Sequence, residues 1–573
     1  MMTHALLLTL ILAGADPAVS ETAESATTAT FVDIPKLVDE AERSYLVQRW
    51  DRAIDKYQQA VAANPTVGYL WYRLGTCCLL GKQYETAVDA FTKAHELGAY
   101  EWHPVRIVHR GEAAWGVAAA HARLGNRDDA IRWTKVSLDE GLRDIREFHK
   151  PHFKTLLEDD EFRRLVWADK AKKLSRDEGF RHDLRFAMHE AKRIHYDPFR
   201  ITSEAELDSM AAALDADIPN LTYEEIHVRM MAIMRRLGDG HTHIRRNDKP
   251  RRLAIHFYHF PEGLYIDAAL EAHADLVGAR VLKIGDVAAG DAYERARDIT
   301  SHDNEMNIRA VAPRLLESVA LLSGMGIWSG EGPVPLEVED AAGKQRTVEI
   351  SIVERGIPDH EFIYDVPGCD TPQPLCLQHR DKPYWFETLP EERLVFFQFN
   401  SVGNAPDESF ADFCGRLFEE VAKPEVDALV IDMRYNGGGN TFLNVPMIEG
   451  IIRSEKLQKR GNLFVIIGRR TFSAAQNTTT ELERRTQAIL VGEPTGSNPN
   501  FIGESIVVRL PYSGWVMSPS DLWWQHSMPM DYRVWTHPQL YAPPTVETCR
   551  QHRDPAMEQI RAYRASSAAD EAE

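Results

Sequence analysis

Two loops decide how the rest of this chain is interpreted: DMRYNGGGN at residues 432–440 and RRTFSAAQN at residues 469–477. Each follows a short, branched apolar run bounded by polar residues, which is the pattern of a buried strand. These runs are DALVI at 427–431 and LFVIIG at 463–468. The sequence therefore predicts two strands that each end in a loop rich in small residues.

The two loops carry groups that a serine hydrolase needs. Gly437, Gly438 and Gly439 permit backbone conformations closed to other residues, so their N–H groups can approach a ligand closely. Ser473 stands among small neighbours between a strand and a predicted helix. Such N–H donors stabilise an oxyanion, and such a serine is a nucleophile. The alternative is a pair of ordinary strand-end turns, where glycine, asparagine and serine are common.

The composition is that of a globular chain with several domains. At 573 residues the chain is too long for a single core, so about three or four domains are expected. Hydrophobic residues make up 44% and charged residues 27%, which is ordinary for a globular protein. The net charge of −20 argues against nucleic acid or an anionic membrane as the main partner.

Residues 1–20 resemble a secretory signal peptide. An apolar centre at 6–12 precedes AVS at 18–20, where a signal peptidase requires small residues. No later apolar run approaches the roughly 20 residues that span a membrane. We therefore expect an exported protein, periplasmic or secreted, without a transmembrane segment. Cys369 and Cys376 flank a proline-rich loop, and an oxidising compartment would allow a disulfide between them.

Residues 32–165 are predicted to form helical repeats. WDRAI at 50–54 and YETAV at 84–88 are 34 residues apart, and RDDAI at 127–131 follows after a longer insertion. This pattern resembles the tetratricopeptide repeat in its period and in its alternation of small and aromatic residues. Such repeats stack into a curved array that binds a peptide or protein partner. A helical spacer or a cap on the next domain is the alternative.

Residues 175–250 are predicted to be helical and to include the loop GDGHTHI at 238–244. Two histidines two positions apart on a strand face the same side and can bind a metal. No HExxH or other carboxylate-bearing motif accompanies His241 and His243, so a metal-dependent hydrolase is the less favoured alternative and no cofactor is predicted. His241 lies in the tight part of the turn, where it is a candidate general base toward a serine from elsewhere in the chain.

Residues 251–355 are predicted to be rich in strands and to close with a hairpin around Gly343. The order of elements is similar to a PDZ-type module with a helical insertion at about 302–329. Such modules bind chain ends by adding a strand to their own sheet, whereas a lid or a spacer is the alternative. The remaining segments are a proline-rich connection at 356–390, an α/β domain at 391–550 and a C-terminal tail at 551–573.

The loops GDGHT, DMRYNGGG and TFSAAQN, followed by VGEPTG at 491–496, occur in the order found in the tail-specific, or C-terminal processing, serine peptidase family. The resemblance covers about 175–544. It implies a multidomain α+β chain with a PDZ-like β-module and a crotonase/ClpP-like α/β catalytic domain, which cleaves peptides through a serine acyl-enzyme. It makes Ser473 the candidate nucleophile. The N–H groups of 437–439 and of Ala474 become the candidate oxyanion hole.

The family activates its serine in two ways. One branch uses a lysine downstream, and the matching stretch here, PTGSN at 494–498, has no lysine. The tricorn-like branch uses a histidine from the loop before the β-module, and His241 fits that position. In that branch an acidic residue shortly precedes a closing turn, and Asp531 stands where it is expected, to orient the base or a bridging polar group. Glu504 is a second candidate acid.

The sequence thus predicts an exported serine peptidase that acts through Ser473, His241 and Asp531 on peptide or protein substrates. A different class of protein is the alternative: an inactive scaffold whose repeats and β-module bind protein partners. The large non-catalytic share of the chain motivates that alternative. The joint presence of the serine, the histidine and the glycine loop argues against it.

Overall fold

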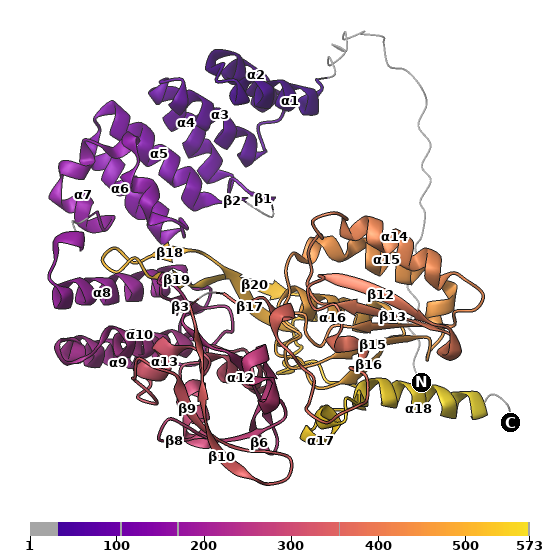
Figure 1. The fold of residues 1–573 in the computed structure, drawn as a ribbon. Helices are drawn as coiled ribbons and strands as arrows, with labels where there is room; N and C mark the ends of the chain where they lie inside the picture. Colours follow the sequence, from indigo (N-terminus) through magenta and orange to yellow (C-terminus); the bar gives the residue numbers. More distant parts are fainter. Residues whose placement is uncertain (1–31, 104–105, 169–170, 355, 571–573) are drawn as a thin grey trace, which may run out of the picture. The chain divides into compact units, whose positions relative to one another are not determined.

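The computed structural model describes residues 32–570 except 104–105, 169–170 and 355 (Figure 1). The chain divides into two compact units, one ending at Glu140 and one beginning at Gly141. The predicted signal peptide lies outside the described residues. Within them, no helix has both the length and the apolar character needed to cross a membrane.

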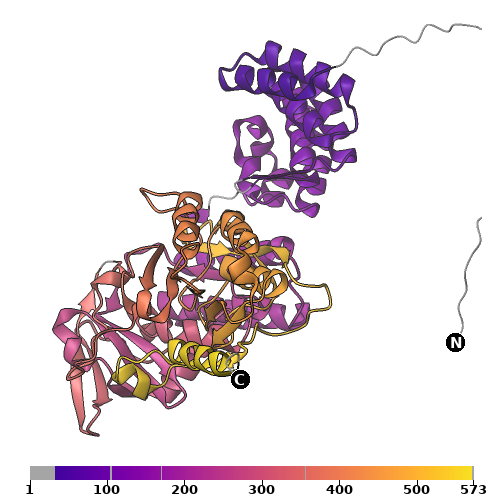
Figure 2. The same ribbon diagram turned by 90° about the vertical axis from the view of Figure 1, so that its right-hand side faces the viewer.

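The first unit is an array in which each helix packs against the next one in the sequence (Figure 2). Its helices are α1 (Ile34–Leu46), α2 (Trp50–Ala63), α3 (Gly68–Leu80), α4 (Tyr84–Glu96), α5 (Arg110–Leu124) and α6 (Arg127–Asp139), with a hairpin of β1 (Glu101–His103) and β2 (Arg106–Val108). The 34-residue spacing in the sequence separates the starts of α2 and α4. The helical character is confirmed, and the repeat family remains a prediction.

The second unit begins with a helical segment: α7 (Asp160–Leu165), α8 (Arg176–Ile194), α9 (Glu204–Asp217) and α10 (Tyr223–Met234). Thr222 starts α10 by accepting the Glu225 N–H at 3.2 Å, while the Glu225 carboxylate accepts the Thr222 N–H at 2.7 Å. After α10, Gly238 has a φ of +82°, which favours glycine and turns the chain into the loop that carries His241.

The β-module contains an antiparallel sheet in the order β10-β9-β7-β6-β5, with β8 paired to β7. Its strands are β5 (Ile255–Phe260), β6 (Gly263–Ala269), β7 (Arg280–Ile284), β8 (Val287–Ala288), β9 (Val334–Glu339) and β10 (Gln345–Ile350), and its helices are α11 (Ala289–Arg297), α12 (Glu305–Leu315) and α13 (Val319–Gly324). The predicted hairpin around Gly343 is confirmed as β9–β10. The helix α12 packs against the edge strand β5.

The C-terminal α/β region is built on one sheet, in which all neighbouring pairs except β12–β13 are parallel. Its order is β12 (Tyr384–Leu389), β13 (Leu394–Phe399), β14 (Ala428–Asp432), β15 (Leu463–Ile467), β16 (Ile489–Gly492) and β21 (Leu540–Tyr541). One face is covered by α14 (Phe410–Val421), α15 (Val445–Arg453) and α16 (Ala474–Arg485), and the other by α18 (Pro555–Asp570), which follows α17 (Val546–Arg550) (Figure 1). The two predicted strands are confirmed as β14 and β15.

Shorter strands join the helical segment to the α/β region. β3 (His243–Arg245) pairs with β19 (Val516–Ser518), which also pairs with β18 (Val508–Arg509). β17 (Asn500–Ser505) pairs with β20 (Ser520–Gln525). The pairing of His243 with Ser518 therefore fixes the GDGHT loop to the α/β region. Cys369 and Cys376 are free thiols, so the disulfide considered for them is not formed.

Replacing glycine by alanine is expected to change the stability in opposite directions at two positions in neighbouring helices of the α/β region. A β-carbon at Gly450 in α15 would lie 2.0 Å from the Phe418 ring, whereas one at Gly415 in α14 would meet nothing within 4 Å. We expect Gly450→Ala to lower the free energy of unfolding by about 1–3 kcal/mol through overpacking. We expect Gly415→Ala to raise it by up to about 1 kcal/mol, because alanine favours the helix. Urea unfolding would measure both, and equal stabilities would contradict the packing of α14 on α15.

Candidate active site

Ser473 lies at the turn between β15 and α16, directly before the first residue of the helix. Its φ of +54° and ψ of −124° are a combination that residues with a side chain rarely adopt. A strained turn between a strand and a helix holds a serine hydroxyl away from the helix that follows. The helix dipole adds partial positive charge at the same point. The predicted position of this serine, between a strand and a helix, is confirmed.

The glycine loop after β14 packs directly against this turn. A β-carbon at Gly438, where φ is +107°, would lie 2.7 Å from Cβ of Ser473 and 2.9 Å from the backbone nitrogen of Ala474. The N–H of Gly438 donates to the Asn436 side chain at 2.9 Å, so it is occupied within the loop. Among the hydrogen bonds of the described residues, the N–H groups of Gly437, Gly439 and Ala474 have no protein acceptor.

His241 is brought to the same place by stacking. Its ring lies 4.5 Å from the Phe472 ring and 5.5 Å from the Phe501 ring, centroid to centroid. Phe472 immediately precedes Ser473, so the histidine lies beside the turn that carries the serine. Burial lowers the pKa of His241 to about 4, although the charge of Asp239 opposes this shift. The imidazole is therefore neutral at pH 7, the state that a general base requires.

The loop of His241 is held by the buried carboxylate of Asp239. One oxygen of Asp239 accepts the N–H groups of His241 at 2.8 Å and Thr242 at 2.7 Å, and the Ser520 hydroxyl at 2.7 Å. The other oxygen lies 2.8 Å from Nε2 of His195. Burial opposes ionisation here, yet hydrogen bonds from His195 and Ser520 hold the pKa of Asp239 well below its usual range. Asp239 thus fixes the backbone that presents His241.

Asp303 and Ser497 connect the two halves of the site, and the sequence analysis had assigned neither. The Ser497 hydroxyl accepts the Ser473 N–H at 3.3 Å and donates to Asp303 at 2.8 Å. The other oxygen of Asp303 accepts the Gly240 N–H at 2.7 Å. Burial, reinforced by the charge of Asp239, raises the pKa of Asp303 to about 7. The position of PTGSN in place of the lysine turn is a signal that could have identified Ser497, whereas no local pattern marks Asp303.

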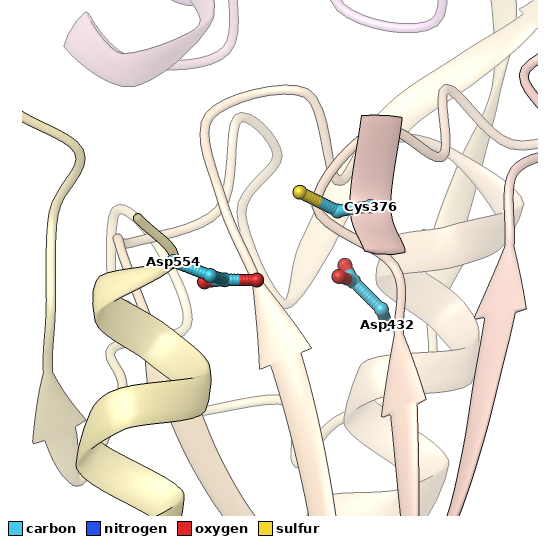
Figure 3. A group of neighbouring side chains, drawn as sticks. All are labelled: Cys376, Asp432 and Asp554. Atoms are coloured by element: carbon cyan, nitrogen blue, oxygen red, sulfur yellow. The ribbon is translucent and has the colours of Figure 1, made fainter. Parts of the chain in front are cut away.

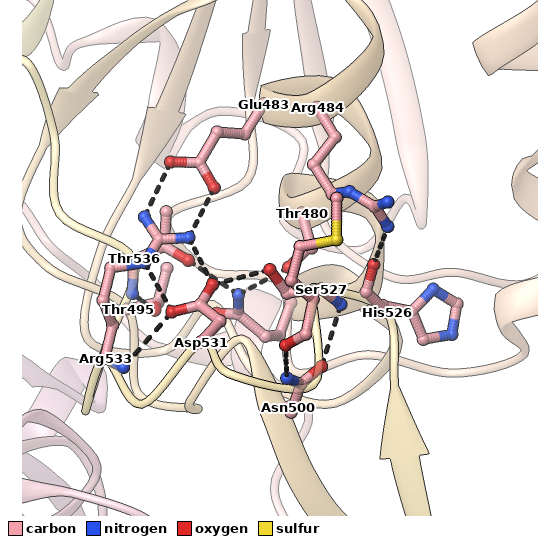
Figure 4. A network of polar contacts seen from close by, with 12 residues as sticks. Thr480, Glu483, Arg484, Thr495, Asn500, His526, Ser527, Asp531, Arg533 and Thr536 are labelled. Carbon is pink, nitrogen blue, oxygen red and sulfur yellow. Dashed lines mark hydrogen bonds and ion pairs between the residues drawn. The ribbon is translucent and has the colours of Figure 1, made fainter. Parts of the chain in front are cut away.

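Asp531 contributes to a different network (Figure 4). Its carboxylate accepts the Ser527 hydroxyl at 2.6 Å and the Arg533 guanidinium at 2.8 and 2.9 Å. Arg533 also donates to Glu483 of α16 at 2.8 Å. The hydrogen bond with Arg533 is the main reason that the pKa of Asp531 falls to about 2. Asp531 therefore fastens the turn at 527–533 to α16.

The structure does not join His241 to either predicted acid. Within the described part of the chain, no hydrogen bond connects its ring with Asp531, Glu504 or Ser473, and Nδ1 is buried without a partner. Glu504 is exposed on β17 with a φ of +60°. His241 thus lies beside the serine turn, and the Phe472 ring and a hydrogen bond with the Ile502 backbone orient it in place of a predicted acid.

Among the described residues, His241 and His243 of the GDGHTHI loop do not belong to a group of side chains that could hold a metal ion. His243 is exposed, and its Nδ1 lies 2.8 Å from the carbonyl oxygen of His241. The described residues place Cys376, Asp432 and Asp554 close enough to share a metal ion (Figure 3). Arg434 pairs with both carboxylates, at 2.8 Å to each, and burial raises the pKa of the Cys376 thiol. This group therefore fits an internal ion-pair cluster rather than a metal.

Comparison with known proteins identifies solved structures that have a similar fold. No family model matches this sequence, and no curated protein matches it either. The structure of mature CPAF complexed with lactacystin has 13% sequence identity and a TM-score of 0.50, over 68% of this chain and 98% of that chain. The photosystem II D1 C-terminal processing protease has 12% identity and a TM-score of 0.35, over 67% of this chain and 96% of that chain.

The tricorn protease is also similar, with 14% identity and a TM-score of 0.34, over 69% of this chain and 37% of that chain. At such identities the likeness establishes the fold alone, and this conclusion rests on the match to mature CPAF. The structural neighbours with lower TM-scores include a C-terminal processing protease and the tricorn protease, which are proteases of the kind that the sequence motifs resemble. The function of the chain depends on the chemistry of its site rather than on the fold.

Asp303 predicts a specific dependence of stability on pH. Its folded-state pKa of about 7 lies above the value of about 3.9 for an unfolded aspartate, so the folded state holds the proton more tightly. Stability from this group is therefore full below about pH 4 and is lost as pH rises to about 7. We expect the wild type to lose about 2–4 kcal/mol more than Asp303→Asn between pH 4 and 8. Urea unfolding at a series of pH values would measure this, and parallel curves would contradict the assignment.

Proposed function

We propose that this chain is a serine peptidase in which Ser473 is the nucleophile and His241 the general base. The observation that carries the proposal is the strained turn of Ser473, packed against Gly438 at the start of α16. A serine held in this way beside unoccupied N–H donors and a neutral imidazole has the parts that acyl transfer requires. No other part of the described chain combines these three features.

Each group has a definite task in this reaction. The oxygen of Ser473 bonds to the peptide carbonyl carbon as its proton passes to His241. The N–H groups of Gly437, Gly439 and Ala474 receive the negative charge that develops on the carbonyl oxygen. When the C–N bond breaks, the imidazolium returns the proton to the departing amine. Water then repeats the sequence and releases the acid from Ser473.

The carboxylates act through the backbone in this proposal. Asp239 sets the position of the His241 loop, and Asp303 joins that loop to the serine turn through Ser497. Asp531 is a positioning residue, because it fixes the turn beside α16 and reaches the site only through it. Glu504 is exposed and is the weaker candidate for this role.

An exposed apolar surface on the turn at 527–533 supports the proposed substrate class. The turn that Asp531 fixes exposes Met528, Met530 and Tyr532, whose exposed fractions are 57%, 70% and 86%. An extended peptide with apolar side chains would bury this surface. We infer a peptide or protein substrate, with cleavage near chain ends as the motif resemblance implies. Export of the chain, partner binding by the helical repeats and a PDZ-like role for the β-module belong to the same proposal.

A binding scaffold is the second candidate function. It is favoured by one observation: His241 makes no hydrogen bond with a carboxylate in the described residues, so its orientation has no acidic support. In that case the helical repeats and the β-module would carry the function. The serine turn would then be a structural remnant of the fold.

A fluorophosphonate probe would test the nucleophile. We expect it to label the wild type on Ser473, and we expect Ser473→Ala to abolish labelling and His241→Ala to slow it by about 10²–10⁴-fold. Ser527→Ala is a matched control. The Ser527 hydroxyl is buried in the Asp531 network and should not react with the probe, so this variant should be labelled as the wild type is. Labelling that survives Ser473→Ala would refute the proposal. Partner capture that persists in Ser473→Ala, without labelling of the wild type, would favour the scaffold.

The pH dependence of labelling would test the base. Because burial lowers the pKa of His241 to about 4, its neutral form predominates above that pH. We expect the labelling rate to rise with pH through about 4 and to be level by pH 6. A rise centred near pH 6.5, the ordinary value for a histidine, would show that His241 is not the desolvated base.

A further inference from the structure

A cavity separates the β-module from the sheet of the α/β region. Its volume is about 120 Å³, and it is partly open to solvent. Residues of β5, β6 and α12 line one side, and the ends of β14 and β15, with the chain around α17, line the other. Neither Ser473 nor His241 reaches it. The cavity is therefore separate from the proposed catalytic site.

The charge of this cavity is strongly one-sided. Eight of its lining residues are arginines, and Asp267 is the one acidic lining residue. Several of these arginines form ion pairs with carboxylates that do not line the cavity. Arg469 pairs with Glu493 at 2.6 Å, and Arg314 pairs with Glu317 at 3.0 Å. The arginines that are not neutralised in this way define where a ligand would bind.

Among the described residues, Arg470 and Arg550 are the lining arginines that make no ion pair. Arg550 donates to the Gly278 carbonyl oxygen at 2.8 Å, whereas Arg470 has only the more distant charge of Asp359. Among the described residues its guanidinium makes no ion pair and no hydrogen bond, and its contact is with the Tyr435 ring, 5.8 Å from the centroid. Burial and the positive charges of Arg314 and Arg380 lower the pKa of Arg470. A guanidinium is nevertheless always protonated in practice. Arg470 is only half-buried, and an anion beside it would supply the counter-charge that it lacks at ion-pair distance.

Arg380 supplies further unused donors beside the same ring. Its side chain is 9% exposed and pairs through one amino group with Asp359. Its Nε and Nη1 are buried without a partner. It lies 4.8 Å from the Tyr435 centroid and 4.5 Å from the Tyr364 centroid, and the Tyr364 hydroxyl is also buried without a partner. Unmade hydrogen bonds of buried donors are destabilising, and a ligand oxygen would make them.

We propose that this cavity binds a small amphipathic oxyanion. Its carboxylate or phosphate head would lie between Arg380 and Arg470, where guanidinium donors suit planar or tetrahedral oxyanions. Its apolar body would pack on the aromatic wall formed by Phe257, Phe260 and Tyr265. The proposal does not depend on the chemistry of Ser473. Arg470 precedes that serine by three positions, so the anion would neutralise charge at the base of the serine turn.

Two probes distinguish the possible head groups. Phenyl phosphate and phenylacetate would be titrated into the full chain by isothermal calorimetry, with inorganic phosphate and sodium chloride at equal ionic strength as references. We expect saturable binding of at least one aromatic anion, tighter than that of inorganic phosphate. The probe that binds more tightly identifies the head group. No saturable binding of either aromatic anion by the wild type would overturn the proposal.

The decisive variant is Arg470→Gln. We expect it to bind the preferred anion at least about tenfold more weakly, because one charged hydrogen-bonding partner is lost. Its unfolding temperature without ligand should equal or exceed that of the wild type, since a half-buried charge without an ion pair is removed next to Arg314 and Arg380. Unchanged affinity would overturn the proposal.

Two further variants test whether a loss of affinity is specific to the cavity. Tyr364→Phe removes only the unpartnered hydroxyl, so it should fold normally and bind several-fold more weakly. Arg453→Gln is the matched control, because that side chain is 78% exposed and pairs with Glu449 outside the cavity. It should bind as the wild type does. Equal weakening in Arg453→Gln and Arg470→Gln would reduce the effect to net charge and overturn the proposed site.

Discussion

The parallel pairing of β14 with β15 is the constraint on which the proposed site depends. Asp432 stands opposite Ile466, so both strands release their loops at the same edge of the sheet. The glycine loop and the serine turn then meet so closely that a β-carbon at Gly438 would lie 2.7 Å from Cβ of Ser473. Glycine is required there by space as well as by its φ of +107°. The N–H donors beside the serine follow from this contact.

The histidine reaches the serine by an independent route. β3 pairs with β19, and the buried carboxylate of Asp239 gathers the N–H groups of His241 and Thr242. Stacking of Phe472 and Phe501 on the imidazole completes the placement and removes water from it. The same desolvation that lowers the pKa of His241 raises that of Asp303. Burial thus favours the uncharged forms of both groups between about pH 4 and 7.

Two arginines of the second unit differ in whether a carboxylate pairs with them. Arg434 lies between Asp432 and Asp554 and pairs with both, whereas Arg470 lines a cavity and makes no ion pair with the described residues. A paired cluster of this kind holds a fold together, and an unpaired cation leaves room for an external anion. The two sites share a wall, since Arg434 and Cys376 also line the cavity. Structural and ligand-binding roles of arginine therefore adjoin here.

The sequence by itself determined the local elements of this protein. Apolar runs at 427–431 and 463–468 gave β14 and β15, Gly343 marked a hairpin, and Ser473 was placed between a strand and a helix. These patterns are readable because they depend on neighbours within a few residues. The order of the loops also indicated the fold, which the likeness to mature CPAF supports.

Only the tertiary structure decided which distant groups meet. Asp303 lies 194 residues from Ser497 and joins it to Gly240, and no local pattern distinguishes that aspartate from others. The same is true of Asp531, which the sequence assigned to the base and the structure places on Arg533. Nothing in the local sequence distinguishes Arg470 from other basic residues after a strand, and only the folded chain places it in the wall of a cavity. Pairing and desolvation are long-range properties, and the folded chain alone sets them.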